Sequence, residues 1–196
     1  TYIQSSSLPI TPKTGSWYHF AASRSGSTVY WWVNGISAGT TSDSTNWTGS
    51  ATSTRIGTDL SGSFVFDGYF GDMRVVLGSA IYTSAFTPPT APLTAVSGTW
   101  LLCNFTNAAI YDNAIKNDLE TVGNAQISTS VKKYGTGSMS FNGTTDYLVA
   151  TGINAMQFTG DFTMEAWVYP TVSQGSEAFI IGEETTNKLK LTIGTL

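Results

Sequence analysis

Hydrophobic and polar positions alternate most clearly along residues 161–170, Asp-Phe-Thr-Met-Glu-Ala-Trp-Val-Tyr-Pro. In an extended strand, successive side chains point to opposite faces of the sheet. One face then carries Phe162, Met164, Ala166 and Val168, and the other carries Thr163, Glu165, Trp167 and Tyr169. Because the first face is wholly apolar and the second holds two aromatic rings, we predict a central strand that is covered on both sides. Pro170 has no N–H to donate and should end the ladder.

Further short runs of β-branched and aromatic residues recur at the spacing of about 8–12 residues that is typical of β-sandwiches. Asn34-Gly35 marks a hairpin turn. Residues 39–53 are expected to form a long polar loop, and residues 80–86 an irregular segment or a single helical turn. No helical pattern of useful length is present, so the sequence predicts an all-β fold. The predicted strands are residues 2–5, 17–23, 28–33, 54–57, 64–66, 69–77, 100–105, 126–128, 137–141, 147–150, 162–169, 177–183 and 188–193.

Two groups of segments carry a family resemblance. The first group contains residues 135–143 (GTGSMSFNG), 146–148 and 160–170 (GDFTMEAWVYP), and the second contains residues 17–26 (WYHFAASRSG), 29–35, 68–76 (GYFGDMRVV) and 81–89. They are similar, respectively, to the first and the second half of a laminin G-like (concanavalin A-like lectin/glucanase) jelly-roll unit. The resemblance implies a two-sheet antiparallel jelly-roll sandwich. Its particular form is similar to the tandem units of marine-phage structural and tail-fibre proteins.

The two halves stand in reversed order along this chain. Residues 1–93 resemble the C-terminal half of a unit, residues 94–99 are interpreted as a linker, and residues 100–196 resemble the N-terminal half. One arrangement is a single permuted sandwich in which the two halves complete each other. The other is one period of a tandem array, whose halves complete the neighbouring units. Half a sandwich leaves an unpaired edge and an uncovered apolar face, so neither half should be stable alone.

Composition narrows the class of protein. The 196 residues suit one sandwich domain, and only 11% of them are charged while 41% are hydrophobic. The surface must therefore be rich in uncharged polar groups, which favours a virion or extracellular location. The formal net charge of −4 leaves no basic surface for nucleic acid. No run of 18 apolar residues is present, so we expect no membrane span.

Catalytic chemistry is not expected. Glucanases of this fold need two carboxylates, about 5 Å apart in retaining enzymes, and the strand 162–169 supplies only Glu165. We interpret Glu165 as a hydrogen-bonded structural carboxylate. The single cysteine, Cys103, lies in an apolar run and is interpreted as a buried small hydrophobe rather than as the partner of His19.

The resemblance implies carbohydrate binding through aromatic platforms beside amide and hydroxyl groups. The candidate residues are Trp47 with Asn46 in a polar loop, and Tyr30 with Trp32 on one strand face. The alternative is that these rings are packing residues. The predicted function is a non-catalytic structural or adhesive module of a virion or extracellular fibre that binds surface glycan. The rival is a purely structural assembly or decoration subunit without a small ligand, whose partners are copies of itself or neighbouring structural proteins.

A structural Ca²⁺ site is the one cofactor for which the sequence offers ligands. Calcium prefers several oxygen ligands from loops, and Asp112, Asn113 and Asp72 could supply them if the halves fold together. The alternative is turn chemistry, in which these side chains bond to nearby backbone amides.

Overall fold

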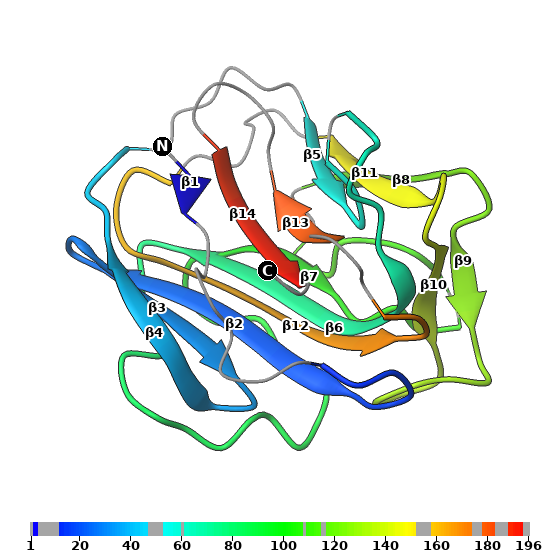
Figure 1. Ribbon diagram of the computed structural model, residues 1–196, viewed down its shortest axis with the longest axis horizontal. Coiled ribbons are helices and arrows are strands. Elements are labelled where there is room, and N and C mark those ends of the chain that lie inside the picture. The colour runs from blue at the N-terminus through cyan, green and yellow to red at the C-terminus, as the bar shows by residue number, and fades with distance from the viewer. Residues whose placement is uncertain are drawn as a thin grey trace.

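The computed structural model describes residues 2–3, 12–46, 53–59, 61–107, 109–114, 117–151, 158–173, 178–182 and 188–193. Its regular elements are all β-strands, and the described residues contain no helix that could cross a membrane. The strands form two sheets that pack face to face (Figure 1). The predicted all-β, two-sheet antiparallel sandwich of the concanavalin A-like kind is confirmed.

Strand order is best given sheet by sheet, for the described part of the chain. The smaller sheet runs β1 (Tyr2–Ile3), β14 (Lys188–Ile193), β13 (Ala178–Gly182), β5 (Ser53–Ile56), β11 (Tyr147–Thr151) and β8 (Asp118–Val122). The larger sheet runs β4 (Ile36–Ser42), β3 (Thr28–Val33), β2 (Tyr18–Ser25), β12 (Phe162–Pro170), β6 (Asp67–Leu77), β10 (Ser138–Asn142) and β9 (Gln126–Ser128), with β7 (Thr99–Cys103) also paired to β6. Neighbouring strands are antiparallel except for β1 and β14, which pair in parallel.

Both sheets draw strands from both halves of the chain. In the larger sheet β12 lies between β2 and β6, and in the smaller sheet β5 lies between β13 and β11 (Figure 1). Within this chain, each half therefore supplies the neighbours that pair the other half's edges. The choice between a permuted single domain and one period of an array stays a prediction.

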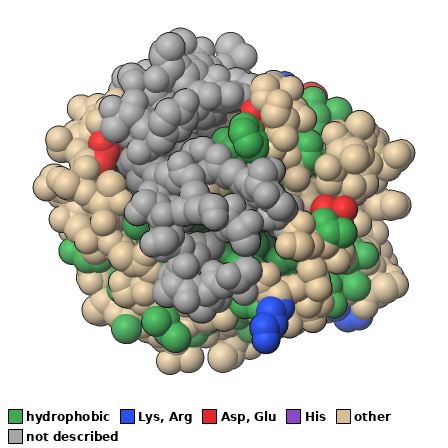
Figure 2. Space-filling model, in the orientation of Figure 1, with side chains coloured by type: hydrophobic (Ala, Val, Ile, Leu, Met, Phe, Trp, Pro, Cys, Tyr) green, Lys and Arg blue, Asp and Glu red, His purple; other side chains and the backbone are tan. Residues whose placement is uncertain are grey.

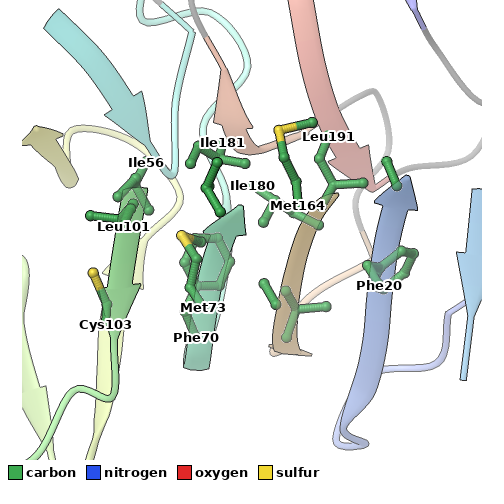
Figure 3. Packing of buried hydrophobic residues seen from close by; sticks show 14 of the residues in the cluster. Phe20, Ile56, Phe70, Met73, Leu101, Cys103, Met164, Ile180, Ile181 and Leu191 are labelled. Carbon is green, nitrogen blue, oxygen red and sulfur yellow. The ribbon is translucent and has the colours of Figure 1, made fainter. Parts of the chain in front are cut away.

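Strand β12 is central and covered on both faces, as its alternation predicts. Its apolar side chains lie between the sheets, where Met164 and Met73 of the larger sheet pack with Ile180 and Leu191 of the smaller one (Figure 3). On the opposite face, Glu165 is 1% exposed although it carries a carboxylate. We call this second face, which points away from the smaller sheet, the outer face.

A long connection covers the middle of the outer face. We call residues 79–93 the strap; it forms the green loop beneath the larger sheet in Figure 1. Ile81 N donates to Thr163 Oγ1 over 2.8 Å, and Phe86 N donates to Gly35 O over 3.1 Å. At its end, Leu93 N donates to Asp72 Oδ2 over 2.8 Å. The strap has no regular secondary structure, which agrees with the prediction of an irregular segment, rather than a helical turn, at residues 80–86.

Two local predictions are wrong. Residues 39–42 belong to the edge strand β4 rather than to a loop, because the Asn34-Gly35 turn, with φ of 50° and 75°, brings them beside β3. Residues 64–66 are not a strand. The apolar side chain of Phe66 contributes to the core and not to a strand: the centroid of its ring lies 4.5 Å from that of the Phe70 ring.

Candidate functional site

Glu165 is the centre of a buried hydrogen-bond network on the outer face. It lies on β12 opposite Ala21 of β2 and Arg74 of β6. Arg74 Nε and Nη2 both donate to Glu165 Oε1, the Nε bond being 2.8 Å long. His19 Nε2 lies 3.0 Å from Oε2, and the hydroxyl of Tyr82 in the strap donates to the same oxygen over 2.8 Å. Four donors from three elements thus converge on one carboxylate, as the interpretation of a structural carboxylate requires.

The electrostatics of this network follow from its geometry. Burial alone raises the pKa of Glu165, but the hydrogen bond from His19 and the charge of Arg74 outweigh it, so the net pKa shift is downward. Burial and then the neighbouring carboxylate raise the pKa of Tyr82, so its hydroxyl stays protonated and donates. Glu165 is therefore held ionised, with no proton to deliver to a substrate.

Asp72 is a second carboxylate on the outer face, and sequence reasoning did not place it beside Glu165. It precedes Arg74 by two residues on β6, so the two side chains share a face. Burial first, and the charge of Glu165 among smaller causes, raise the pKa of Asp72. Both carboxylates are nevertheless sealed, with exposures of 1% for Glu165 and 3% for Asp72. In the described structure, both carboxylates are thus enclosed by protein groups.

The predicted aromatic candidates lie at the β4 end of the outer face. The rings of Tyr30 and Trp32 stack with a centroid distance of 6.3 Å, while Trp31 faces the core. Trp32 is buried, and its Nε1 donates to the strap carbonyl of Tyr82 over 3.1 Å. Tyr30 is half-buried and keeps part of its ring at the surface. Trp32 is therefore a packing residue, and Tyr30 is the member of the pair that a ligand could contact.

Asn46 does not join these rings. Arg24 faces the core side of the larger sheet, as its contact with the Phe162 ring shows, and its Nη1 donates to the carbonyl of Thr45. The neighbour of Asn46 is thus tied to the side of the sheet opposite Tyr30. Asn46 itself is exposed. Trp47 lies outside the described residues, so its role stays a prediction.

The comparison with protein families agrees with this architecture. Residues 2–88 match the laminin G-like family model described as the concanavalin A-like lectin/glucanases superfamily. The comparisons with curated proteins and with solved structures found no match. The family resemblance predicted from the sequence is confirmed, whereas the similarity to marine-phage proteins stays a prediction.

In this concanavalin A-like sandwich the calcium candidates lie in one hydrogen-bonded region, in which Asp72 and Asp112 accept and Asn113 donates. Asn104 Nδ2 donates to Asp72 Oδ1 over 3.0 Å, and Asn113 Nδ2 donates to Asn104 Oδ1 over 2.7 Å. Asp112 accepts the backbone N–H of Leu102 at 2.8 Å and further N–H groups from its own loop. Among the described residues, no group of three or more His, Cys, Asp or Glu is placed to hold a metal ion. The arrangement matches the turn-chemistry alternative; a Ca²⁺ site stays a prediction.

Sequence reasoning missed the partners of Glu165. Arg74 carried a usable signal, since it interrupts the apolar run 73–77 and its charge needs a partner once that strand is buried. Tyr82 carried none, because its segment has no periodic pattern. His19 was noticed but not oriented. Its Nδ1 has no hydrogen-bond partner in the described part of the chain, which is consistent with a proton on Nε2 facing the carboxylate.

Proposed function

We propose that this chain is a non-catalytic carbohydrate-binding module of a virion or an extracellular fibre. The superfamily includes lectins and glucanases by its description, so binding and hydrolysis are the two functions to compare. One observation supports binding over hydrolysis: Glu165 is 1% exposed and accepts hydrogen bonds at both carboxylate oxygens. A hydrolytic acid or nucleophile must contact its substrate, and this carboxylate is enclosed by protein groups.

The character of the surface also supports binding of a neutral ligand. Among the side chains that Figure 2 colours, charged ones are few and scattered among uncharged polar and apolar groups. Only 11% of all residues are charged. Such a surface suits the hydroxyl groups of neutral sugars better than a phosphate or a nucleic acid, which would need clustered cations.

The experiment is a glycan array probed with the labelled protein, followed by a reducing-end assay on every glycan that binds. We expect binding without release of new reducing ends. Tyr30→Ala and Trp47→Ala test whether the residues predicted from the sequence take part. Hydrolysis that disappears in Glu165→Gln would overturn the non-catalytic proposal. If the protein binds none of the glycans, the carbohydrate-binding proposal fails and the assembly function is favoured.

The assembly function has one observation of its own. In the described part of the chain, β4 is one of the two edges of the larger sheet, and the side chain of Ile36 on it is 68% exposed. An unpaired edge strand with an exposed apolar side chain is a surface on which another copy could pair. Light scattering at increasing protein concentration, compared between wild type and Ile36→Lys, tests this candidate. If the chain assembles through this edge, the mass of the wild type should grow with protein concentration, and the mass of Ile36→Lys should not.

A further inference from the structure

Five side chains form a row across the end of the larger sheet that is remote from Tyr30. The strand register places Gln126 of β9 opposite Ser140 of β10, Ser140 opposite Tyr69 of β6, and Tyr69 opposite Tyr169 of β12. The ring of Trp17, just before β2, continues the row with its centroid 5.3 Å from that of Tyr169. We call these five residues the aromatic row. Its strands meet at the right-hand end of the larger sheet in Figure 1.

All members on strands point to the outer face, away from the core. Their neighbours Met139, Phe70 and Val168 belong to the core cluster, and side chains alternate along a strand. Gln126 is exposed and the other four members are half-buried, so every member of the row is accessible from one side. With strands about 4.8 Å apart, a row across five positions is roughly 19 Å long.

Within the residues that the structure describes, the polar atoms of the aromatic rings in this row have no hydrogen-bond partner. Neither the hydroxyl groups of Tyr69 and Tyr169 nor the indole N–H of Trp17 bonds to any other group in the described ranges. The rings themselves are held firmly, since Tyr69 and Tyr169 meet edge to face at 5.9 Å. The row thus presents fixed rings and unused donors and acceptors, a combination that interior packing alone does not require.

The sheet is shaped beneath the row to admit an aromatic ring. Gly71 of β6 has no side chain, and a Cβ there would lie 3.4 Å from Cζ3 of Trp17 and 3.1 Å from Cβ of Trp167. The Trp17 ring therefore reaches over β6. Lys133 Nζ lies 4.0 Å from the centroid of the Trp167 ring and encloses this end of the site.

Trp167 provides an independent sign of a missing partner. Its side chain is 5% exposed, and its Nε1 is buried with no hydrogen-bond acceptor among the residues that the structure describes. Most buried indole N–H groups have a hydrogen-bond partner, because a buried donor without an acceptor destabilises the fold. Since Lys133 covers this ring with a flexible side chain, a ligand hydroxyl that displaces the lysine could accept the bond.

These features favour a neutral oligosaccharide over other ligands. A sugar ring offers an apolar face to stack on tryptophan or tyrosine and hydroxyl groups around its edge. In the row, the aromatic rings can stack on the apolar face of the sugar, and the amide, the hydroxyl and the phenols can bond to its hydroxyl groups. A proline-rich peptide would use the rings and offer its carbonyls as acceptors, but proline has no N–H and so lacks the donors that the hydroxyl groups of a sugar supply to oxygen acceptors such as those of Gln126 and Ser140. The row contains no charge, so an ionic ligand gains little.

We propose that the aromatic row Gln126–Ser140–Tyr69–Tyr169–Trp17 binds a neutral oligosaccharide chain that lies across the strands. The ligand class rests on the proposed function, whereas the position of the site rests on the geometry of the row. This site is separate from Tyr30, Trp32 and Asn46.

Isothermal titration with cellohexaose, laminarihexaose and mannohexaose tests the site. For whichever hexasaccharide binds the wild type, we expect Trp17→Ala and Tyr169→Ala each to weaken affinity by about fivefold or more. The matched control, Tyr111→Ala, removes an exposed tyrosine outside the row and should change affinity less than twofold. Tyr30→Ala is measured beside it, because Tyr30 belongs to the site predicted from the sequence.

A fold-neutral variant guards against loss of structure. Gln126→Ala/Ser140→Ala removes two polar side chains at the sheet margin, and we expect weaker binding with an unchanged urea midpoint. If the wild type binds but affinity falls only in Tyr30→Ala, the row is overturned while the proposed function stands. If no hexasaccharide binds and a proline-rich peptide does, both the row's ligand class and the proposed function fail.

Discussion

Replacing Glu165 with glutamine should strongly destabilise the fold. The two Glu165 oxygens accept four hydrogen bonds, two from Arg74 at Oε1 and one each from His19 and Tyr82 at Oε2. Glutamine has one oxygen and one NH₂ group. At the Oε1 position the NH₂ group faces two donors of Arg74, which cannot accept, and at the Oε2 position it faces His19 Nε2 and the Tyr82 hydroxyl, both of which donate to the carboxylate in the native structure.

The size of the effect follows from these bonds. Two hydrogen bonds to a charged group are lost, at about 1.5–3 kcal/mol each, and the Arg74 charge stays buried without its counter-ion. Removal of one partner of a buried ion pair costs about 3–5 kcal/mol, which agrees with that sum. For a protein of this size, we expect the melting temperature to fall by roughly 6–20 °C.

The pH dependence gives a second signature. The folded-state pKa of Glu165 lies below the ordinary value of 4.5, so its ionised form stabilises the fold. This stabilisation is complete above the unfolded-state pKa and is lost as pH falls through the lower folded-state pKa. Asp72 has the opposite shift, so only the difference between the wild type and Glu165→Gln isolates Glu165.

Urea unfolding followed by tryptophan fluorescence between pH 2.5 and pH 7 measures both effects. The matched control is Glu120→Gln, on an exposed position of the edge strand β8, which should leave the free energy of unfolding nearly unchanged. A loss below about 1 kcal/mol at pH 7, with the acid limb of the curve unaltered, would refute the role of Glu165 as a buried ionised anchor.

Three further predictions concern the strap, the loops and the assembly state. In urea unfolding, Gly35→Ala should lose more stability than Gly26→Ala. Both residues have positive φ, but a Cβ at Gly35 would lie 1.8 Å from Phe86 O, whereas a Cβ at Gly26 would meet nothing within 4 Å. Equal losses of stability in the two variants would contradict the contact between the strap and Gly35. Addition of Ca²⁺ or of a chelator should leave the melting temperature unchanged, because Asp72 and Asp112 already accept protein hydrogen bonds; a rise of several degrees with Ca²⁺ would support the calcium prediction. Light scattering should show a monomer that unfolds cooperatively, since the halves pair with each other, and a ladder of oligomers would favour the tandem-array arrangement.

The sequence predicted those elements whose own residues determine their structure. Strand β12 was recognisable because each of its faces has a consistent character, and the Asn34-Gly35 turn because few residues adopt positive φ. Strand β4 was not, because its Ser, Thr and Gly residues follow no apolar pattern. It is a strand because β3 offers hydrogen bonds beside it, which is a property of the fold and not of the segment.

The same distinction applies to the site. That Glu165 would be a hydrogen-bonded structural carboxylate could be predicted from its place on a covered strand. Its partners could not, since His19 and Arg74 lie 146 and 91 residues away in the chain and are brought together by strand order and register. The aromatic row was hidden for the same reason. Its members are scattered from Trp17 to Tyr169, and only the register of the larger sheet aligns them.

The buried network also explains why the outer face has two different ends. An apolar cluster of similar volume could stabilise a covered sheet as well as an ion pair does. Apolar contacts would hold the strap in several positions, whereas four directional bonds on Glu165 are satisfied together in one, with Tyr82 of the strap as a member. The strap then seals the carboxylates and buries Trp32. The aromatic row lies beyond this sealed region, so the anchor that encloses the carboxylates in the middle of the face also leaves the row accessible to a ligand.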